Sequence, residues 1–288
     1  MEFEKSGSRD PNALEHEQSI QPLDSVKRSP WKRLNYLLNV VKELQPEAVD
    51  AFARNLELRY GSLVESPTVE DSQIGLEDLI PEMTLLLKYP VLALNNLNYF
   101  LQLLELPEGT DWTNDKLEVP IRIFNRAFLV PKYNNVQVLT ETIGREDGIR
   151  VYKEYVTRFV DDWVSSEPER HSTLEEMRQD WLKDDEDNPG LVRQVGTVED
   201  GKVVVRKDNC LWADSLVDLP DTELKYLVCC YGDFTSIRVY NRSFALTMEQ
   251  TVAAGDHYCD VVVHDTRIDN DLKHPSKDFF DSIGPLDE

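Results

Sequence analysis

The sequence predicts an α+β protein in which a helical N-terminal segment precedes an antiparallel sheet with packed helices. Two observations support this prediction. Up to about residue 164, apolar residues recur at intervals of three and four, as they do in amphipathic helices. Beyond residue 189 the interval shortens towards two, which is typical of strands.

The composition is that of a globular protein of 288 residues, 41% of them hydrophobic. No stretch approaches the length of about eighteen apolar residues that a membrane span needs, and the N-terminus is too acidic for a secretory signal. We therefore expect a cytoplasmic protein without a membrane partner. The net charge of -23 opposes binding to nucleic acid or anionic lipid, and its simplest role is solubility.

The first 118 residues are expected to contain a leader followed by helices. Residues 1–29 are polar and lack apolar periodicity, which predicts a disordered leader. A helix should begin at Ser29-Pro30 and bury an apolar stripe of Leu34, Leu37, Leu38, Val41 and Leu44. Further helices are predicted at 46–60, 76–87 and 92–104. The apolar stripes of this helical segment, 30–118, should serve as an accessory layer or as the surface of a homo-oligomer.

Residues 119–265 form the predicted α+β domain. Its first helices extend to Val130, before Pro131, and then from Asp147 to Val164, where an aromatic stripe fits core packing better than a ligand wall. Asp200-Gly201 between two valine-rich runs predicts a tight hairpin. A helix should then run from Pro220 through Cys230 to Asp233, followed by strands at 243–252 and 258–264. Residues 266–288 are expected to be an acidic tail.

All four cysteines lie between Cys210 and Cys259, among acids and histidines. On the predicted helix Cys230 and Asp233 share a face. On the last strand, alternation places His257 with Cys259 on one face and Asp260 on the other. A thiol, a base and an orienting acid are the parts of nucleophilic catalysis. The alternatives are that the cysteines fill the core or bind zinc.

Zinc is the weaker alternative because the sequence has no Cys-x-x-Cys and Cys229-Cys230 would diverge on a helix. We therefore predict no metal and no cofactor. We expect one pocket to contain the chemically competent residues Cys210, Cys230, Asp233, His257, Cys259 and Asp260. Function should depend on a thiolate.

Four sequence elements together resemble the L-2-amino-thiazoline-4-carboxylic acid hydrolase-like family. They are Cys210, then Cys230-Tyr231-Gly232-Asp233, Asn241-Arg242-Ser243-Phe244, and the stretch from Thr251 to Asp260 with its Thr-x-x-x-Gly-Asp-x-x-Cys-Asp pattern. Gly144-Arg145-Glu146-Asp147-Gly148 is similar to a helix start of that family. Val261 and the stretch 239–242 depart from it, which is compatible with a relative acting in specialised biosynthesis.

The resemblance implies hydrolysis of a non-peptide carbon–nitrogen bond in a small cyclic amidine, opening a thiazoline ring to a carbamoyl-cysteine product. Cys230 or Cys259 would attack, His257 would move protons, and Asp233 or Asp260 would hold the amidinium. Cys210 and Arg242 would contact the substrate, and the guanidinium group of Arg242 would bind the carboxylate of the substrate. The alternative is a noncatalytic small-molecule-binding or assembly protein on the same fold.

Overall fold

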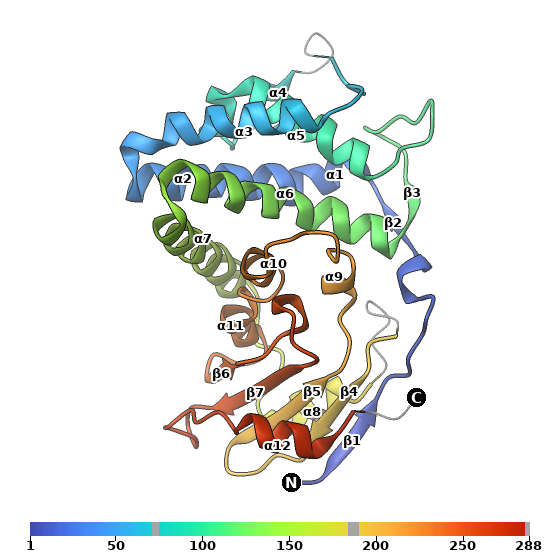
Figure 1. Cartoon of the computed structure of the whole chain (residues 1–288), viewed down its shortest axis with the longest axis vertical. Coiled ribbons are helices and arrows are strands. Elements are labelled where there is room, and N and C mark those ends of the chain that lie inside the picture. The colour runs from blue at the N-terminus through green and yellow to red at the C-terminus, as the bar shows by residue number, and fades with distance from the viewer. Residues whose placement is uncertain (71–74, 184–189, 286–288) are drawn as a thin grey trace. The chain divides into compact units, whose positions relative to one another are not determined.

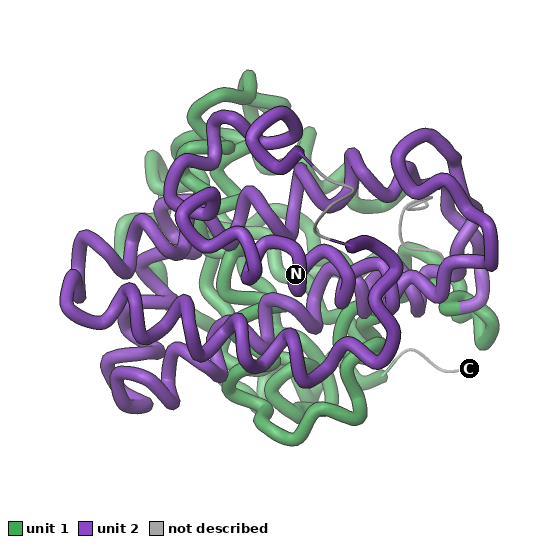
Figure 2. The backbone as a smooth tube through the Cα atoms, turned by 90° about the horizontal axis from the view of Figure 1, so that it is seen from above, with its two compact units in different colours: residues 1–14, 160–288 green, residues 15–159 purple. Residues whose placement is uncertain are grey.

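The computed structural model describes residues 1–70, 75–183 and 190–285 (Figure 1). The chain is divided into two compact units, one of residues 15–159 and one that combines residues 1–14 with 160–288 (Figure 2). The structure is 53% helical and has a five-stranded antiparallel sheet with packed helices, so the predicted α+β class is confirmed.

The unit of residues 15–159 is mainly helical. It contains β2 (Glu17–Ile20), α1 (Pro22–Val26), η2 (Lys27–Trp31), α2 (Lys32–Leu44), η3 (Pro46–Ala48), α3 (Val49–Leu63), α4 (Leu76–Leu79), η5 (Leu86–Lys88), α5 (Pro90–Leu103), β3 (Leu117–Pro120), α6 (Ile121–Ile143) and most of α7 (Arg145–Ser166). The predicted stripe of α2 is confirmed, because Leu34, Leu37, Leu38 and Val41 are all buried. Helices α3, α5 and α6 pack against one another around this core.

Proline and glycine did not end helices where the sequence predicted. Pro30 lies inside η2, a π-helical turn that continues from α1 into α2, so no helix begins at Ser29-Pro30. Pro131 lies inside α6 and Gly61 inside α3. Both prolines are buried, and a π-turn is a known way to accommodate a missing N–H. Tertiary packing therefore outweighed the local signal.

The prediction that residues 1–29 form a disordered leader is wrong. Strand β1 (Phe3–Ser6) pairs antiparallel with β4 (Arg193–Gly196), and β2 pairs antiparallel with β3. Strand β1 is at the edge of its sheet, where short strands with charged residues are common. Its four residues carry too little apolar pattern to be recognised as a strand.

The unit of residues 1–14 and 160–288 contains the sheet. After α7 come α8 (Leu174–Trp181), β4, β5 (Lys202–Lys207), α9 (Leu211–Asp214), α10 (Thr222–Cys229), α11 (Asp233–Ser236), η6 (Ile237–Val239), β6 (Phe244–Thr247), η7 (Val252–Ala254), β7 (Cys259–Asp265) and α12 (Lys277–Ile283). A short turn, η1 (Ala13–Glu15), lies at the boundary between the units. The strand order is β1-β4-β5-β7-β6 and every pairing is antiparallel.

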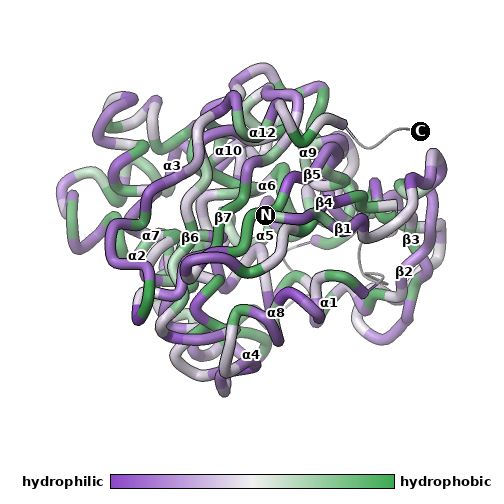
Figure 3. The backbone as a smooth tube through the Cα atoms, turned by 90° about the horizontal axis from the view of Figure 1, so that it is seen from below, coloured by the Kyte–Doolittle hydropathy of each residue, from purple (hydrophilic) through white to green (hydrophobic). Residues whose placement is uncertain are grey.

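Both faces of the sheet are covered. One face packs Val203, Val205, Cys259 and Val261 against Met177 of α8. The other packs Val204, Tyr258 and Val262 against Phe280 of α12. Three consecutive valines at the middle of β5 and of β7 supply both faces, so these central strands are apolar in their middle and charged towards their ends (Figure 3).

The predicted hairpin is present. Asp200 and Gly201 join β4 to β5 with positive φ angles of 48° and 74°, and the flanking Glu199 and Lys202 exchange both backbone hydrogen bonds. Positive φ at both central residues is what a two-residue turn between strands requires. Gly201 also faces Ile268, which leaves no room for a side chain.

The predicted boundary at residue 118 does not divide the units, because α6 and most of α7 belong with the N-terminal helices. The expected acidic tail, 266–288, contains α12, whose Phe280 is fully buried; residues 286–288 of that tail lie outside the described residues. None of the helices that the structure describes combines the length and apolar content needed to cross a membrane.

Candidate active site

Cys259 is held at the start of β7 by a compact loop. Thr251 begins η7, accepting the N–H of Ala254 on its side chain, and Gly255 ends the turn with a φ of 103°. Asp256 accepts the backbone N–H of Thr251 at 2.8 Å. The backbone N–H of Val252 then points at the sulfur of Cys259, 3.4 Å away. The Thr-x-x-x-Gly-Asp-x-x-Cys pattern is therefore a loop that directs an N–H to a thiol.

Cys230 enters the same neighbourhood from α10. Asp221 caps the start of this helix by accepting the N–H of Leu224, and Cys230 is its C-cap residue. The prediction that one helix continues to Asp233 is wrong, since α10 ends at Cys229 and Asp233 begins α11. The Cys230 side chain is buried among small and apolar residues, namely Ala213, Ala253, Cys210, Cys229, Tyr226, Met248 and Val252.

Four of the six residues expected in one pocket interact electrostatically. Burial raises the pKa of the Cys230 thiol well above its usual value, and the Asp233 carboxylate and the thiols of Cys229, Cys259 and Cys210 raise it further. Burial likewise raises the pKa of Cys210. The structure thus brings together Cys210, Cys230, Asp233 and Cys259, from three segments of the chain.

Lys207 was not singled out from the sequence. In the antiparallel pairing of β5 with β7 it lies directly opposite Cys259. Burial raises the pKa of Cys259 to about 12, while the N–H of Val252 and the ammonium group of Lys207 act in the opposite direction. Lys207 also lowers the pKa of Cys210 and of Asp233. In the sequence, Lys207 is recognisable only as a basic residue shortly after the valine run at 203–205.

Asp233 is the acid beside the thiols. Its side chain keeps contact with solvent, but the protein atoms around it raise its carboxyl pKa by desolvation to about 6, against the opposing effect of Lys207. Contact with water limits how far such a shift can go. The group is therefore an acid that can gain or lose a proton near neutral pH.

His257 is not brought to the thiols by the strand. Strand β7 begins at Cys259, and His257 occupies the bend before it with an exposed side chain. The prediction that the two residues share a strand face is therefore wrong. In the described part of the chain the His257 side chain makes no hydrogen bond or ion pair.

Asp260 is on the opposite face of β7 from Cys259 and is almost completely buried. Its Oδ1 accepts the backbone N–H groups of Glu249 at 2.8 Å and Gln250 at 2.7 Å. Its Oδ2 lies 3.2 Å from Nε2 of His274. We had expected Asp260 in the pocket of the thiols, and this expectation is wrong. Asp260 instead binds the backbone of the loop that leads to Cys259.

Arg242 is occupied by the backbone. Its guanidinium group donates to the carbonyl oxygens of Val164 at 2.6 Å, Glu167 at 2.7 Å and Arg238 at 2.5 Å. The Val164 carbonyl belongs to the last turn of α7 and that of Glu167 directly follows the helix, where a cation is favourable. The expectation that Arg242 binds a substrate carboxylate is not supported by these contacts, which give it a structural role.

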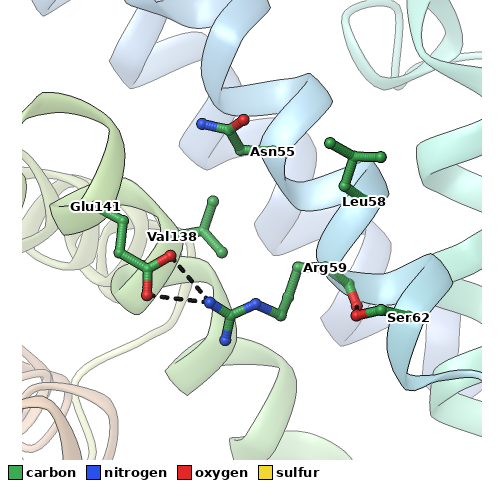
Figure 4. Close-up of a pocket in the computed structure, with 6 residues that line it drawn as sticks. All are labelled: Asn55, Leu58, Arg59, Ser62, Val138 and Glu141. Carbon is green, nitrogen blue, oxygen red and sulfur yellow. Dashed lines mark hydrogen bonds and ion pairs between the residues drawn. The ribbon is translucent and has the colours of Figure 1, made fainter.

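A separate surface depression of about 420 Å³ lies between α3 and α6 (Figure 4). It is lined by Asn55, Leu58, Arg59, Ser62, Val138 and Glu141. Arg59 is paired with Glu141 at 2.9 Å across it, so its charge is already compensated. It contains none of the residues predicted to do chemistry.

Comparison with known proteins identifies one family. Residues 121–263 match the family model of L-2-amino-thiazoline-4-carboxylic acid hydrolase. The matched range includes all four cysteines, Asp233 and Lys207. No significant match to the chain was found among curated proteins or among solved structures. Within the described residues, no group of three or more His, Cys, Asp or Glu is placed to hold a metal ion.

Proposed function

Since residues 121–263 belong to the L-2-amino-thiazoline-4-carboxylic acid hydrolase family, we propose that the chain hydrolyses a non-peptide carbon–nitrogen bond of a small cyclic amidine. The observation that supports this most directly is the environment of Cys259. A backbone N–H and a lysine ammonium group both favour its thiolate, which is the nucleophilic form.

Cys259 is the better nucleophile of the clustered thiols. The Asp233 carboxylate and the neighbouring thiols all oppose ionisation of Cys230, so that thiol stays protonated. Burial, Cys210 and Asp233 also oppose ionisation of Cys259, but Lys207 and the N–H of Val252 act in its favour. Cys210, at the start of α9, also has Lys207 and the N–H groups of Ala213 and Trp212 in favour of ionisation. We assign the attack to Cys259 because Lys207 lies directly opposite it in the sheet.

Asp233 is the proposed acid–base group. Burial keeps Cys259 protonated at rest, so its proton must leave when the substrate binds. A carboxyl group with a pKa of about 6 is largely ionised at neutral pH and can take up a proton or hold a cationic amidine. We assign this task to Asp233 in place of His257, which lies in the exposed bend.

In the proposed reaction the Cys259 thiolate adds to the amidine carbon, and the ring carbon–nitrogen bond breaks as the departing nitrogen takes a proton. Water then adds to the same carbon, supplies the carbonyl oxygen and releases the thiolate. A thiazoline carboxylate would give a carbamoyl-cysteine product. The need for reduced thiols agrees with a cytoplasmic setting.

A noncatalytic small-molecule-binding protein is the second candidate. It is favoured by the packing of Cys230 among alanines and by the raised pKa values of the thiols, which fit a core role. Incubation of the purified protein with thiazolines, cyclic amidines and lactams separates the two. Turnover with a covalent adduct on Cys259, identified by mass spectrometry, supports the hydrolase; tight binding without turnover or adduct supports the second candidate.

A further inference from the structure

The ammonium group of Lys207 lies against an aromatic ring and not against an acid. Its Nζ is 5.9 Å from the centroid of the Trp181 ring, which is within the range of a cation–π interaction. Among the residues that the structure describes, the Lys207 side chain makes no ion pair or hydrogen bond. The chain has 54 acidic and 31 basic residues, so a half-buried lysine without an acidic partner is a feature that needs a reason.

Trp181 is placed by the packing of α8 on the sheet. Leu174, Met177 and Trp181 follow one face of this helix at intervals of three and four. They pack on the sheet face that contains Cys259. Trp181 is the last residue of α8, and its ring reaches the end of β5 at which Lys207 lies.

A second aromatic contact orients the Trp181 ring. Tyr240 meets it nearly at a right angle, with ring centroids 5.9 Å apart and an interplanar angle of 88°. Tyr240 is stacked in turn on His171 at 5.5 Å, and its carbonyl oxygen accepts the backbone N–H of His171 at 2.8 Å. Asp180, the neighbour of Trp181 in the chain, is paired with Lys183 at 3.0 Å and lies 3.5 Å from His171. The ring is therefore held in place, and the acid next to it in the chain is already paired.

An aromatic ring can hold a cation without neutralising it. The ring contributes a quadrupole and no net charge, whereas a carboxylate would cancel most of the field of the ammonium group. Lys207 pairs with Cys259 in the antiparallel ladder, so the two side chains leave the same face of the sheet. There the charge of Lys207 opposes the rise in pKa that burial gives Cys259, Cys210 and Asp233. Since Cys210 and Asp233 themselves disfavour the Cys259 thiolate, the position of this cation matters.

We propose that Trp181 is a positioning residue of the cysteine site, which holds the uncompensated ammonium group of Lys207 beside the Cys259 thiol. A lysine side chain is long and flexible, so without the ring its ammonium group can turn into solvent, where water and salt screen its charge. The use of the thiolate in catalysis rests on the proposed function. The coupling of Trp181 to the thiol through Lys207 does not.

The test is the rate at which iodoacetamide alkylates Cys259 at about pH 9, measured by peptide mass spectrometry in a double-mutant cycle. Trp181→Leu is introduced into the unaltered protein and into Lys207→Met. A change in access to the thiol affects both backgrounds, whereas a change that acts through Lys207 affects only the first. In the unaltered background the rate should fall at least about threefold further than in Lys207→Met. An equal effect in the two backgrounds would overturn the proposal.

Trp181→Phe and Trp163→Leu are the matched variants. Phenylalanine keeps a ring for the cation, so in the same cycle Trp181→Phe should change the rate through Lys207 by less than about twofold. Trp163→Leu makes the same replacement at a tryptophan of α7 that is 41% exposed, and should leave the rate unaltered. If Trp181→Leu fails to fold by circular dichroism, Trp181→Met, which fills more of the space without a ring, replaces it in the cycle. A Trp181→Phe coupling as large as that of the ringless variant would also overturn the proposal.

The alkylation cycle needs no turnover. If the proposed hydrolysis is wrong, the unaltered protein fails to turn over the substrate panel while the coupling between Trp181 and Lys207 stands. If hydrolysis is observed, Trp181→Leu should lower kcat at least about threefold with little change in KM, and Trp181→Phe should keep most of the activity. A kcat of Trp181→Leu equal to that of Trp163→Leu would overturn the link to the cysteine site.

Discussion

The backbone N–H of Val252 donates a hydrogen bond to the sulfur of Cys259 across 3.4 Å. Val252 opens the short η7 turn, so the donor is one of the N–H groups that a helix start leaves available. Lys207 stands opposite Cys259 on the neighbouring strand. Both groups favour the thiolate of Cys259, whereas Cys230 has no such group among the causes of its pKa shift.

Replacing the thiols one at a time should rank them. If Cys259 is the nucleophile, Cys259→Ser lowers kcat about a thousandfold or more, because a serine hydroxyl is far harder to ionise. Cys229→Ser, at the edge of the cluster, should retain kcat within about tenfold. Steady-state kinetics with folding checked by circular dichroism measures both. Full activity in Cys259→Ser would refute the assignment.

The alkylation rate of Cys259 should depend steeply on pH. Its pKa of about 12 against an ordinary value of 9.0 leaves roughly a thousandfold less thiolate at pH 8, and only the thiolate reacts. Reaction with iodoacetamide should therefore be slow and rise about tenfold for each unit of pH. Peptide mass spectrometry measures the rate, with the denatured protein as reference. Equal rates in folded and denatured protein would contradict this expectation.

Asp260→Ala should destabilise the protein. It leaves the N–H groups of Glu249 and Gln250 without an acceptor inside the protein, which costs about 2–4 kcal/mol in the free energy of unfolding. Asp260→Asn keeps an acceptor oxygen and should cost less, while still removing the charge that faces His274. Urea unfolding compares the two variants. Equal stability of Asp260→Ala and the unaltered protein is the contradicting outcome.

Arg242→Lys should affect stability and leave substrate affinity alone. A lysine cannot reach the three carbonyl groups that the guanidinium contacts, so the unfolding free energy should fall by about 1–3 kcal/mol. The control is Arg150→Lys, whose exposed pair with Asp147 contributes little. Thermal unfolding and KM are the measurements. A large rise in KM for carboxylate substrates, with unchanged stability, would restore a binding role.

Gly148→Ala should destabilise the packing of α7 on α6. An added Cβ would lie 2.7 Å from the Cα of Thr140, so backbone must move, at a cost of about 1–3 kcal/mol. Gly61→Ala in α3 is the matched control, because its Cβ would meet only the movable amide of Asn95, and alanine favours the helix. Denaturant unfolding of both variants decides. A Gly148→Ala protein as stable as Gly61→Ala would show that the helices separate without cost.

The helical stripes, the hairpin and the two faces of β7 could be predicted because each depends on residues that are neighbours in the chain. The stripe of Leu34 to Val41 and the turn at Asp200-Gly201 are examples. Strand β1 could not be predicted, and neither could the continuation of helices through Pro30 and Pro131. Their stability comes from partners far along the chain. Local preference gave way to tertiary packing in each case.

By itself the sequence determined the α+β class and the cluster of reactive residues between Cys210 and Cys259, since periodicity and residue type are local properties. Only the tertiary structure decided which of them meet. Strand register put Lys207 opposite Cys259, the fold brought the N–H groups of Glu249 and Gln250 to Asp260, and the late start of β7 left His257 in the bend. Charges act on a thiol over a few ångströms, and chain pairing sets those distances.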